Sequence, residues 1–250
     1  MLHEQTLQLL NAMRLFGMAK GLADRMNSPA TGELSHADFI GLLVQDEKTY
    51  RDNVRLGKLL KRAKFRYQDA ALENVNYRHP RGLAKQALLQ FQDTAWITHH
   101  RNVLITGATG TGKSFLACAL GQLAARAGFT ARYWRAPRLW ENLECARGDG
   151  SHLKTLTQLG KVQVLILDDF LISPLSDSER RDALEIIEDR YGTASTIITS
   201  QLESKHWHEA IGDPTLADAI CDRLLHNAYK LPLKGETIRP EEDKKKGPQP

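Results

Sequence analysis

Residues 102–115 read NVLITGATGTGKSF, and this stretch decides the fold. It opens with a short apolar run that has β-branched members, which is typical of a buried parallel strand. Residues 107–114, GATGTGKS, match the phosphate-loop pattern G-x-x-x-x-G-K-[ST], and a helix rich in alanine and leucine is expected over residues 114–127. Glycines let backbone N–H groups turn toward a polyphosphate, and the helix N-terminus adds partial positive charge. The alternative is a glycine-rich turn that arose by chance. Because a strand precedes the loop and a helix follows it, as the motif requires, the sequence predicts a nucleotide-binding site.

Two side chains of the loop carry particular chemistry. Lys113 can reach the β- and γ-phosphates of a nucleotide, and the Ser114 hydroxyl can take one position on Mg²⁺. The residues predicted to bind the nucleotide are Gly107, Ala108, Thr109, Gly110, Thr111, Gly112, Lys113, Ser114 and Phe115.

A second motif places two carboxylates after an apolar strand, in residues 162–170, VQVLILDDF. This is the form of a Walker B strand. Parallel sheets bind ligands outside the carboxyl ends of their strands, so Asp168 and Asp169 are expected to face the phosphate loop. Asp168 would hold Mg²⁺ together with Ser114, and Asp169 would orient or deprotonate the attacking water. Adjacent aspartates can also be turn residues that end a strand, but the phosphate loop favours the catalytic interpretation.

The composition is that of an ordinary globular protein, with 42% of the 250 residues hydrophobic and 26% charged. No apolar run approaches the roughly 20 residues that span a bilayer, and the amphipathic N-terminus lacks a signal-peptide cleavage site. Cys118, Cys145 and Cys221 lie far apart and form neither a metal-ligand spacing nor a disulfide framework. These features predict a cytoplasmic protein without a membrane partner. The net charge of +4 permits a nucleic-acid partner.

The pattern of residues divides the chain into segments. Residues 1–66 are expected to form a small all-helical domain, with a break at residues 27–32 and a helix whose N-terminus is capped by Ser35. A further helix is expected at residues 81–94. The remaining segments are a linker at residues 67–80, a nucleotide-binding domain at residues 81–239 and a disordered tail at residues 240–250.

The last part of the helical domain is strongly basic. Residues 48–66 hold eight lysines and arginines and one acidic residue, Asp52. On a helical wheel most of these cations share one face beside a stripe of leucines, which suits a helix that lies along phosphates. A solvated charged surface is the alternative, but the shortage of acidic residues favours nucleic-acid binding and assembly on it. The candidate contacts are Arg51, Arg55, Lys58, Lys61, Arg62 and Arg66.

The rest of the chain alternates between strands and helices, as expected for an α/β fold. Further strands are expected at residues 129–135, 195–200 and 229–233, and helices at residues 137–147, 151–159, 178–191, 204–211 and 215–227.

Four stretches together resemble the IstB family, the ATPase helper proteins of insertion-sequence transposons. They are GATGTGKS, VLILDDF, STIITSQ and LADAICDRLLHNAYKLPLKGETIR. The family is related to the DnaC-type helicase loaders and to DnaA within the AAA+ superfamily, and the resemblance extends to about residue 239. It implies an α/β fold: an AAA+ P-loop αβα core with a five-stranded parallel sheet of order 5-1-4-3-2, preceded by a small helical domain. It also implies ATP rather than GTP, Mg²⁺, and a ring or helical homo-oligomer on DNA.

The resemblance also implies roles for single residues. Ser200 or Gln201 would be sensor 1, where AAA+ proteins usually have asparagine. Arg223 would be an arginine finger that acts on ATP bound by the neighbouring subunit, which makes physical sense because a cation there offsets charge on the γ-phosphate. The alternative for Arg223 is an ion pair with Asp222 or Asp218. Arg239 is a candidate for sensor 2.

The double-helical insertion at residues 137–159 resembles an element that faces a DNA channel in the initiator branch. Arg135, Arg138 and Lys154 are therefore candidate DNA contacts. The function implied is an ATPase that oligomerises with ATP on duplex DNA, largely independently of sequence, bends or remodels it and supports a cognate transposase. The alternatives are a DnaC-like replicative helicase loader and a small-molecule kinase that uses the same loop.

Overall fold

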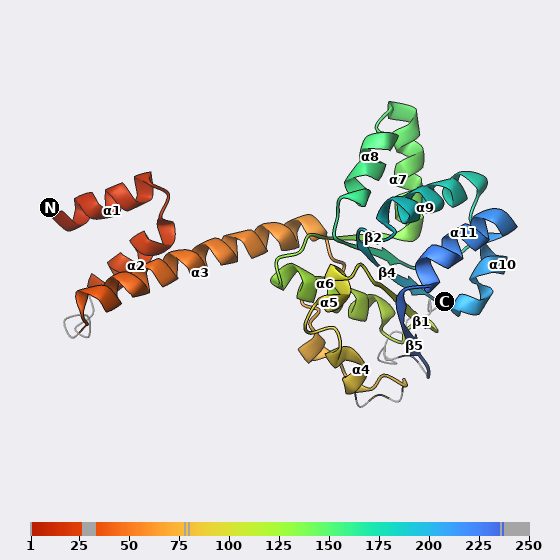
Figure 1. Cartoon of the computed structure of the whole chain (residues 1–250), viewed down its shortest axis with the longest axis horizontal. Helices are drawn as coiled ribbons and strands as arrows, with labels where there is room; N and C mark the ends of the chain where they lie inside the picture. The colour runs from red at the N-terminus through yellow and green to blue at the C-terminus, as the bar shows by residue number, and fades with distance from the viewer. Residues whose placement is uncertain (1, 27–33, 78, 80, 236, 238–250) are drawn as a thin grey trace, which may run out of the picture. The chain divides into compact units, whose positions relative to one another are not determined.

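The computed structural model describes residues 2–26, 34–77, 79, 81–235 and 237 of the chain. The chain forms two compact units, residues 1–58 and residues 59–250 (Figure 1). The predicted break at residues 27–32, the predicted tail at residues 240–250 and Arg239 lie outside the described residues.

The first unit is helical, as the sequence predicts. It contains α1 (Leu2–Ala12), α2 (Phe16–Met26) and most of α3 (His36–Ala63). Ser35 caps α3 as expected, because its hydroxyl accepts a hydrogen bond from the Asp38 backbone N–H at 3.2 Å. Helices α2 and α3 approach closely at Gly17, where a Cβ atom would lie 2.5 Å from the carbonyl oxygen of Asp46.

The second unit is built on one parallel sheet. Its strands lie in the order β2-β3-β4-β1-β5, so the predicted order 5-1-4-3-2 is confirmed. In register, Val103 of β1 lies opposite Ile197 of β4 on one side and Tyr229 of β5 on the other. The strands are β1 (Asn102–Gly107), β2 (Ala131–Arg135), β3 (Val164–Asp168), β4 (Ser195–Ser200) and β5 (Ala228–Leu233).

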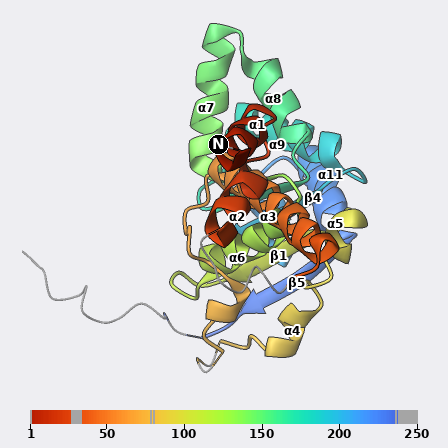
Figure 2. The same cartoon turned by 90° about the vertical axis from the view of Figure 1, so that its left-hand side faces the viewer.

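Helices cover both faces of this sheet (Figure 1). Successive residues of a strand point to opposite faces, so Val103 and Ile105 pack in one buried cluster while Leu104 packs in the other. Helices α7 and α8 lie side by side as a pair (Figure 2). One face carries α4 (Lys85–Leu89), α5 (Ala95–Thr98) and α6 (Lys113–Arg126), and the other carries α7 (Ala136–Asp149), α8 (His152–Gly160), α9 (Asp177–Arg190), α10 (Trp207–Ile211) and α11 (Pro214–Leu225).

The segment expected to be a linker, residues 67–80, packs within the second unit. It contains a short 3-10 helix, η2 (Leu72–Asn74), and buries Ala70, Leu72 and Val75 in the cluster beneath α6. Its role as a connection between two functional domains stays a prediction.

Two local predictions are wrong. The basic helix ends at Ala63, and Lys64 adopts a left-handed conformation with a φ of 53°, so Arg66 does not lie on the helix face predicted for it. The helix expected at residues 81–94 is reduced to α4, after which Thr94 turns the chain with a φ of 56°. Just after each of these left-handed residues, an apolar side chain is buried in the cluster that includes α6, namely Phe65 and Trp96.

Among the described residues, no helix combines the length and the apolar character needed to cross a membrane.

Candidate nucleotide-binding site

The phosphate loop runs from the end of β1 to the start of α6, and its glycines adopt conformations that other residues rarely take. Gly107, Gly110 and Gly112 have φ angles of 147°, 85° and 89°. A Cβ atom at Gly107 would collide with the carbonyl oxygen of Leu233 in the neighbouring strand β5. Gly112 directly precedes α6, so the partly positive helix N-terminus opens onto the loop. The backbone path therefore requires these glycines.

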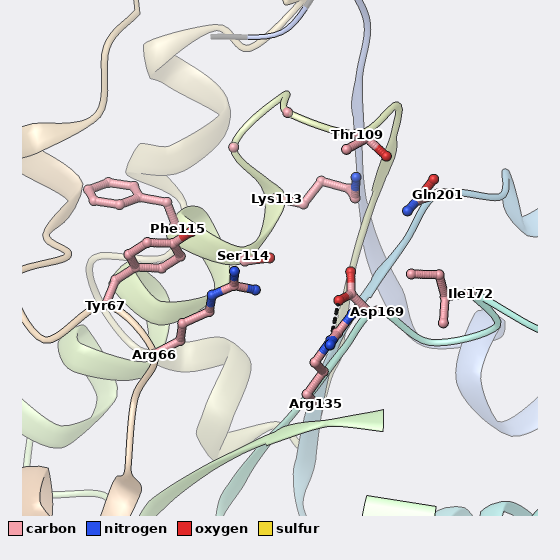
Figure 3. Close-up of a pocket in the computed structure, with 12 residues that line it drawn as sticks. Arg66, Tyr67, Thr109, Lys113, Ser114, Phe115, Arg135, Asp169, Ile172 and Gln201 are labelled. Carbon is pink, nitrogen blue, oxygen red and sulfur yellow. Dashed lines mark hydrogen bonds and ion pairs between the residues drawn. The ribbon is translucent and has the colours of Figure 1, made fainter. Parts of the chain in front are cut away.

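A cavity of about 420 Å³ lies beside the loop (Figure 3). It brings together residues from the loop, from the carboxyl ends of the strands and from the segment after α3. The Lys113 side chain is held at the loop, where its Nζ donates to the carbonyl oxygen of Ala108 at 2.8 Å. The cavity is lined by Arg66, Tyr67, Thr109, Gly110, Gly112, Lys113, Ser114, Phe115, Arg135, Asp169, Ile172 and Gln201.

The predicted residues Ala108 and Thr111 support the loop from within. The Thr111 hydroxyl donates to the Ala108 carbonyl at 2.9 Å. The carbonyl of Thr111 in turn accepts a hydrogen bond from Arg81 Nη1 at 2.8 Å, while Arg81 Nη2 donates to the Asn76 carbonyl at 3.0 Å. Arg81 is only 3% exposed, and burial lowers the pKa of its guanidinium. Through these two hydrogen bonds, Arg81 connects the phosphate loop to the segment around Asn76.

Asp168 ends β3 and is fully buried, with three hydroxyl groups donating to its carboxylate. Ser114 Oγ donates to Oδ1 at 2.8 Å, Thr199 Oγ1 donates to Oδ1 at 2.5 Å, and Tyr133 OH donates to Oδ2 at 2.7 Å. Burial and the bond to Asp168 raise the pKa of Tyr133, so this hydroxyl stays protonated and remains a donor. The guanidinium of Arg66 lies 3.8 Å from Oδ2. A buried carboxylate needs such donors, because burial without them would cost several kcal/mol, on the order of 3 or more.

Asp169 points into the cavity from a left-handed backbone position with a φ of 59°. Its backbone N–H donates to Thr199 Oγ1 at 3.0 Å. Its carboxylate accepts a hydrogen bond from Arg135 Nε at 2.7 Å (Figure 3). Thus Asp168 is turned inward toward the sheet, whereas Asp169 is presented to the cavity.

The donor set suits Mg²⁺ that arrives with a nucleotide. Ser114 Oγ and Asp168 Oδ1 lie 2.8 Å apart beside the loop, so both can serve one cation directly or through water. Mg²⁺ typically uses one or two protein ligands together with substrate phosphates and water. The described part of the chain has no cluster of three or more histidine, cysteine, aspartate or glutamate side chains that could hold a metal by itself. These residues therefore fit a nucleotide-borne Mg²⁺.

The structure separates the two residues considered for sensor 1. Ser200 is fully buried, and its hydroxyl donates to the carbonyl oxygen of Phe170 at 2.8 Å. Gln201 is the residue at the end of β4 that lines the cavity. Thr199, one residue before Ser200, contacts both motif aspartates through its hydroxyl.

Arg223 lies on α11 and does not line the cavity beside the phosphate loop of its own subunit, as far as the chain is described. Its Nη2 donates to Glu188 Oε1 of α9 at 2.6 Å, and its Nη1 donates to the carbonyl of Ala219 at 3.0 Å. The ion pair is thus made with Glu188, rather than with Asp222 or Asp218. Asp218 instead lies 3.1 Å from the Nε2 atom of His208.

A family model described as the IstB-like ATP binding protein matches residues 8–246 of this chain. The chain belongs to the IstB family. The insertion sequence ATP-binding protein y4pL of Sinorhizobium fredii is 48% identical over 96% of this chain and 97% of its own length. The IS21 ATP-binding protein of Pseudomonas aeruginosa is 30% identical over 96% of this chain and 90% of its own length. The predicted family is therefore confirmed.

Solved structures of a helicase loader and of a replication initiator share the fold. The DnaC helicase loader aligns with a TM-score of 0.56 at 24% identity, covering 68% of this chain and 99% of its own. DnaA bound to AMPPCP and single-stranded DNA aligns with a TM-score of 0.58 at 18% identity, covering 69% of this chain and 52% of its own. Together with the sheet order, these alignments confirm the predicted α/β fold and its five-stranded parallel sheet.

Seven of the nine candidate DNA contacts of the IstB-family chain lie on three helices. Arg51 of α3 pairs with Glu47 one turn earlier at 2.7 Å, so one acidic residue just outside the basic segment partly compensates it. Arg135 faces the cavity and pairs with Asp169, and Arg66 also lines the cavity. The candidates with exposed side chains on helices are Arg51, Arg55, Lys58, Lys61 and Arg62 on α3, Arg138 on α7 and Lys154 on α8.

Sequence reasoning missed three residues of this site as members of it: Arg66, Arg81 and Tyr133. Thr199 was recognisable from the sequence, because it lies one residue before the end of the strand between the two motif strands. Tyr133 could have been considered once β2 was placed beside β3. No local pattern distinguishes Arg66 or Arg81 from other arginines, because both reach the site through turns of the chain.

Proposed function

We propose that this IstB-family chain is a Mg²⁺-dependent ATPase that assembles with ATP on duplex DNA and supports a cognate transposase. One observation carries the proposal: the phosphate loop after β1 and Asp169 after β3 line one cavity, and Ser114 of the loop contacts Asp168 at the end of β3. The family description of the chain as ATP-binding supports the choice of nucleotide.

The chemistry follows from the groups around the cavity. Backbone N–H groups of the loop and Lys113 would hold the β- and γ-phosphates. Bound Mg²⁺ would neutralise phosphate charge, held by Ser114 and by Asp168. Asp169, which faces the cavity, would orient and deprotonate the attacking water, and the Gln201 amide would act at the sensor 1 position.

Arg223 would complete the site of a neighbouring subunit. Its place on α11, away from the cavity of its own subunit, supports action in trans. A guanidinium supplied by a neighbour stabilises charge on the γ-phosphate in the transition state, and hydrolysis then depends on assembly. The ion pair with Glu188 would have to open when the neighbouring nucleotide is engaged.

DNA would be held through phosphates by the exposed cations of α3, α7 and α8. Such contacts carry no sequence information, so binding should be largely independent of sequence and should fall steeply with salt. Bending a short duplex costs about 1–6 kcal/mol, which phosphate contacts repeated over an oligomer can offset. The bent DNA would then be presented to the transposase, and the protein would act in the cytoplasm.

Electron microscopy of the protein with duplex DNA tests this proposal. Regular rings or filaments should form with a non-hydrolysable ATP analogue, and they should fail to form with Lys113→Ala or without nucleotide. ATP turnover should rise on addition of DNA, and no small acceptor molecule should become phosphorylated. A protein that remains a monomer with ATP and DNA would contradict the proposal, as would a phosphorylated acceptor. A pull-down assay with this protein as bait tests the partner. Recovery of a replicative helicase instead of a transposase would favour a helicase loader.

A further inference from the structure

Arg66 occupies an unexpected place: its guanidinium lies in the nucleotide cavity rather than on the basic helix. Figure 3 shows it directed toward Ser114, beside the rings of Tyr67 and Phe115. The guanidinium lies 3.8 Å from Asp168 Oδ2 and 5.4 Å from the centroid of the Tyr67 ring. The side chain is 45% exposed, so it can move, whereas Asp168 is fully buried.

The backbone on both sides of Arg66 is anchored to α6, which keeps the side chain at the cavity. Phe65 is buried against Gly121, where a Cβ atom would come within 2.5 Å of the Phe65 ring. On the other side, the Gln122 amide donates hydrogen bonds to the carbonyl oxygens of Tyr67 and Gln68. Arg66 is therefore a positioned residue and differs from the exposed cations of α3.

Binding of a nucleotide with Mg²⁺ would change the charges around the Arg66 guanidinium. Arg66 forms an ion pair with the buried Asp168 carboxylate, so its positive charge partly balances that carboxylate. A Mg²⁺ ion held by Ser114 and Asp168 would stand at the same carboxylate and would repel the guanidinium. The polyphosphate beside Lys113 would attract it, and the planar fork of arginine matches pairs of phosphate oxygens.

We propose that Arg66 is a phosphate ligand of the nucleotide supplied in cis, which balances Asp168 when the site is empty and moves to the phosphates when Mg²⁺ and nucleotide bind. The inference rests on the proposed function, because it assumes that the cavity binds ATP. It adds a substrate-binding residue that comes from the segment directly after α3. Since α3 carries the candidate DNA contacts, this residue links the phosphate state of the nucleotide to the end of that helix.

Direct binding of a fluorescent ATP analogue to the full-length protein without DNA tests the role of Arg66. Arg66→Ala should weaken binding of the triphosphate by about ten- to a hundredfold, the range expected for loss of a charged hydrogen bond. Competition should show a smaller loss for AMP than for ATP. Arg66→Lys should recover part of the affinity. Arg126→Ala is the matched control, because Arg126 is 49% exposed at the end of α6 and pairs with Glu73 outside the cavity.

The outcomes separate the two proposals. If Arg66→Ala binds ATP as tightly as the wild type while Lys113→Ala does not bind, the Arg66 inference is wrong and the nucleotide site stands. An equal loss for ATP and AMP would also overturn it, because Arg66 would then not act on the outer phosphates. If the wild type does not bind ATP at all, the proposed function itself fails. Thermal melting shows whether Arg66→Ala is folded, and Arg66→Gln replaces it if it is not.

Discussion

Arg135 Nε lies 2.7 Å from Asp169 Oδ2, and this contact joins the edge strand β2 to the carboxylate proposed to act on water. The contact exists because β2 pairs with β3 in a register that sets Arg135 opposite Asp168. The side chain of Arg135 is 46% exposed and that of Asp169 is 16% exposed, so solvent and phosphates can reach the pair. While the pair is closed, Oδ2 of Asp169 is engaged by the Arg135 guanidinium and is not available to a water molecule.

Arg135→Ala should therefore raise ATP turnover measured without DNA. A partly exposed ion pair is worth about 0–1 kcal/mol, so freeing Asp169 should increase the rate by at most about fivefold. Arg138 is an exposed arginine in the first turn of α7, and Arg138→Ala is the control that should leave this DNA-free rate unchanged. A lower rate in Arg135→Ala would show that Arg135 itself serves the reaction.

Arg223→Ala should abolish ATP turnover while ATP binding persists, because the arginine is proposed to act on the neighbouring subunit. Arginine fingers contribute about 10³–10⁵ in rate. Mixing Arg223→Ala subunits with Lys113→Ala subunits should restore part of the activity, since some interfaces then combine an intact loop with an intact finger. No recovery on mixing would place Arg223 in its own subunit's chemistry or in folding.

Tyr133→Phe should lower the stability of the second unit and weaken the dependence of nucleotide binding on Mg²⁺. The hydroxyl donates to a fully buried carboxylate, and loss of a hydrogen bond to a charged group costs about 1.5–3 kcal/mol. Denaturant unfolding and Mg²⁺ titrations of nucleotide affinity measure the two effects. Tyr229→Phe provides the control, because its hydroxyl accepts from the exposed Arg101. Equal stability of the two variants would show that the hydrogen bond to Asp168 stabilises the fold no more than the exposed bond from Arg101 to Tyr229.

Glu47 should make the helical unit sensitive to acid. Burial raises the pKa of its carboxyl, but hydrogen bonds from Arg51 and from the backbone N–H groups of Met18 and Gly17 outweigh it and lower the pKa below 4.5. The group thus stabilises the fold fully above about pH 4.5, and this contribution is lost as the pH falls through the lowered value.

Thermal melting of wild type and Glu47→Gln from pH 7 to pH 3 measures this contribution. The variant should be less stable at pH 7 by about 1–3 kcal/mol, and the difference should shrink toward pH 3. Glu144→Gln removes an exposed partner of Arg147 and should change stability by less than about 1 kcal/mol at any pH. A difference for Glu47→Gln that stays constant with pH would show that its charge is not the cause.

Sequence alone predicted the features that depend on local order. The phosphate loop, the apolar strands and the Asp168–Asp169 pair are recognisable because strand, turn and helix follow one another within short stretches. The order of the strands came from the family resemblance, since nothing within a single strand identifies its neighbours.

Only the tertiary structure decided which side chains meet at the site. Tyr133 and Thr199 reach Asp168 because β2 and β4 lie on either side of β3. Ser200 is withdrawn because its side chain points to the face of β4 opposite that of Thr199 and donates to the Phe170 carbonyl. Arg66 enters the cavity because the basic helix ends at Ala63 and Phe65 must be buried. The physical reason is that burial of apolar side chains and pairing of distant strands are long-range constraints, and they place polar groups that no local pattern marks.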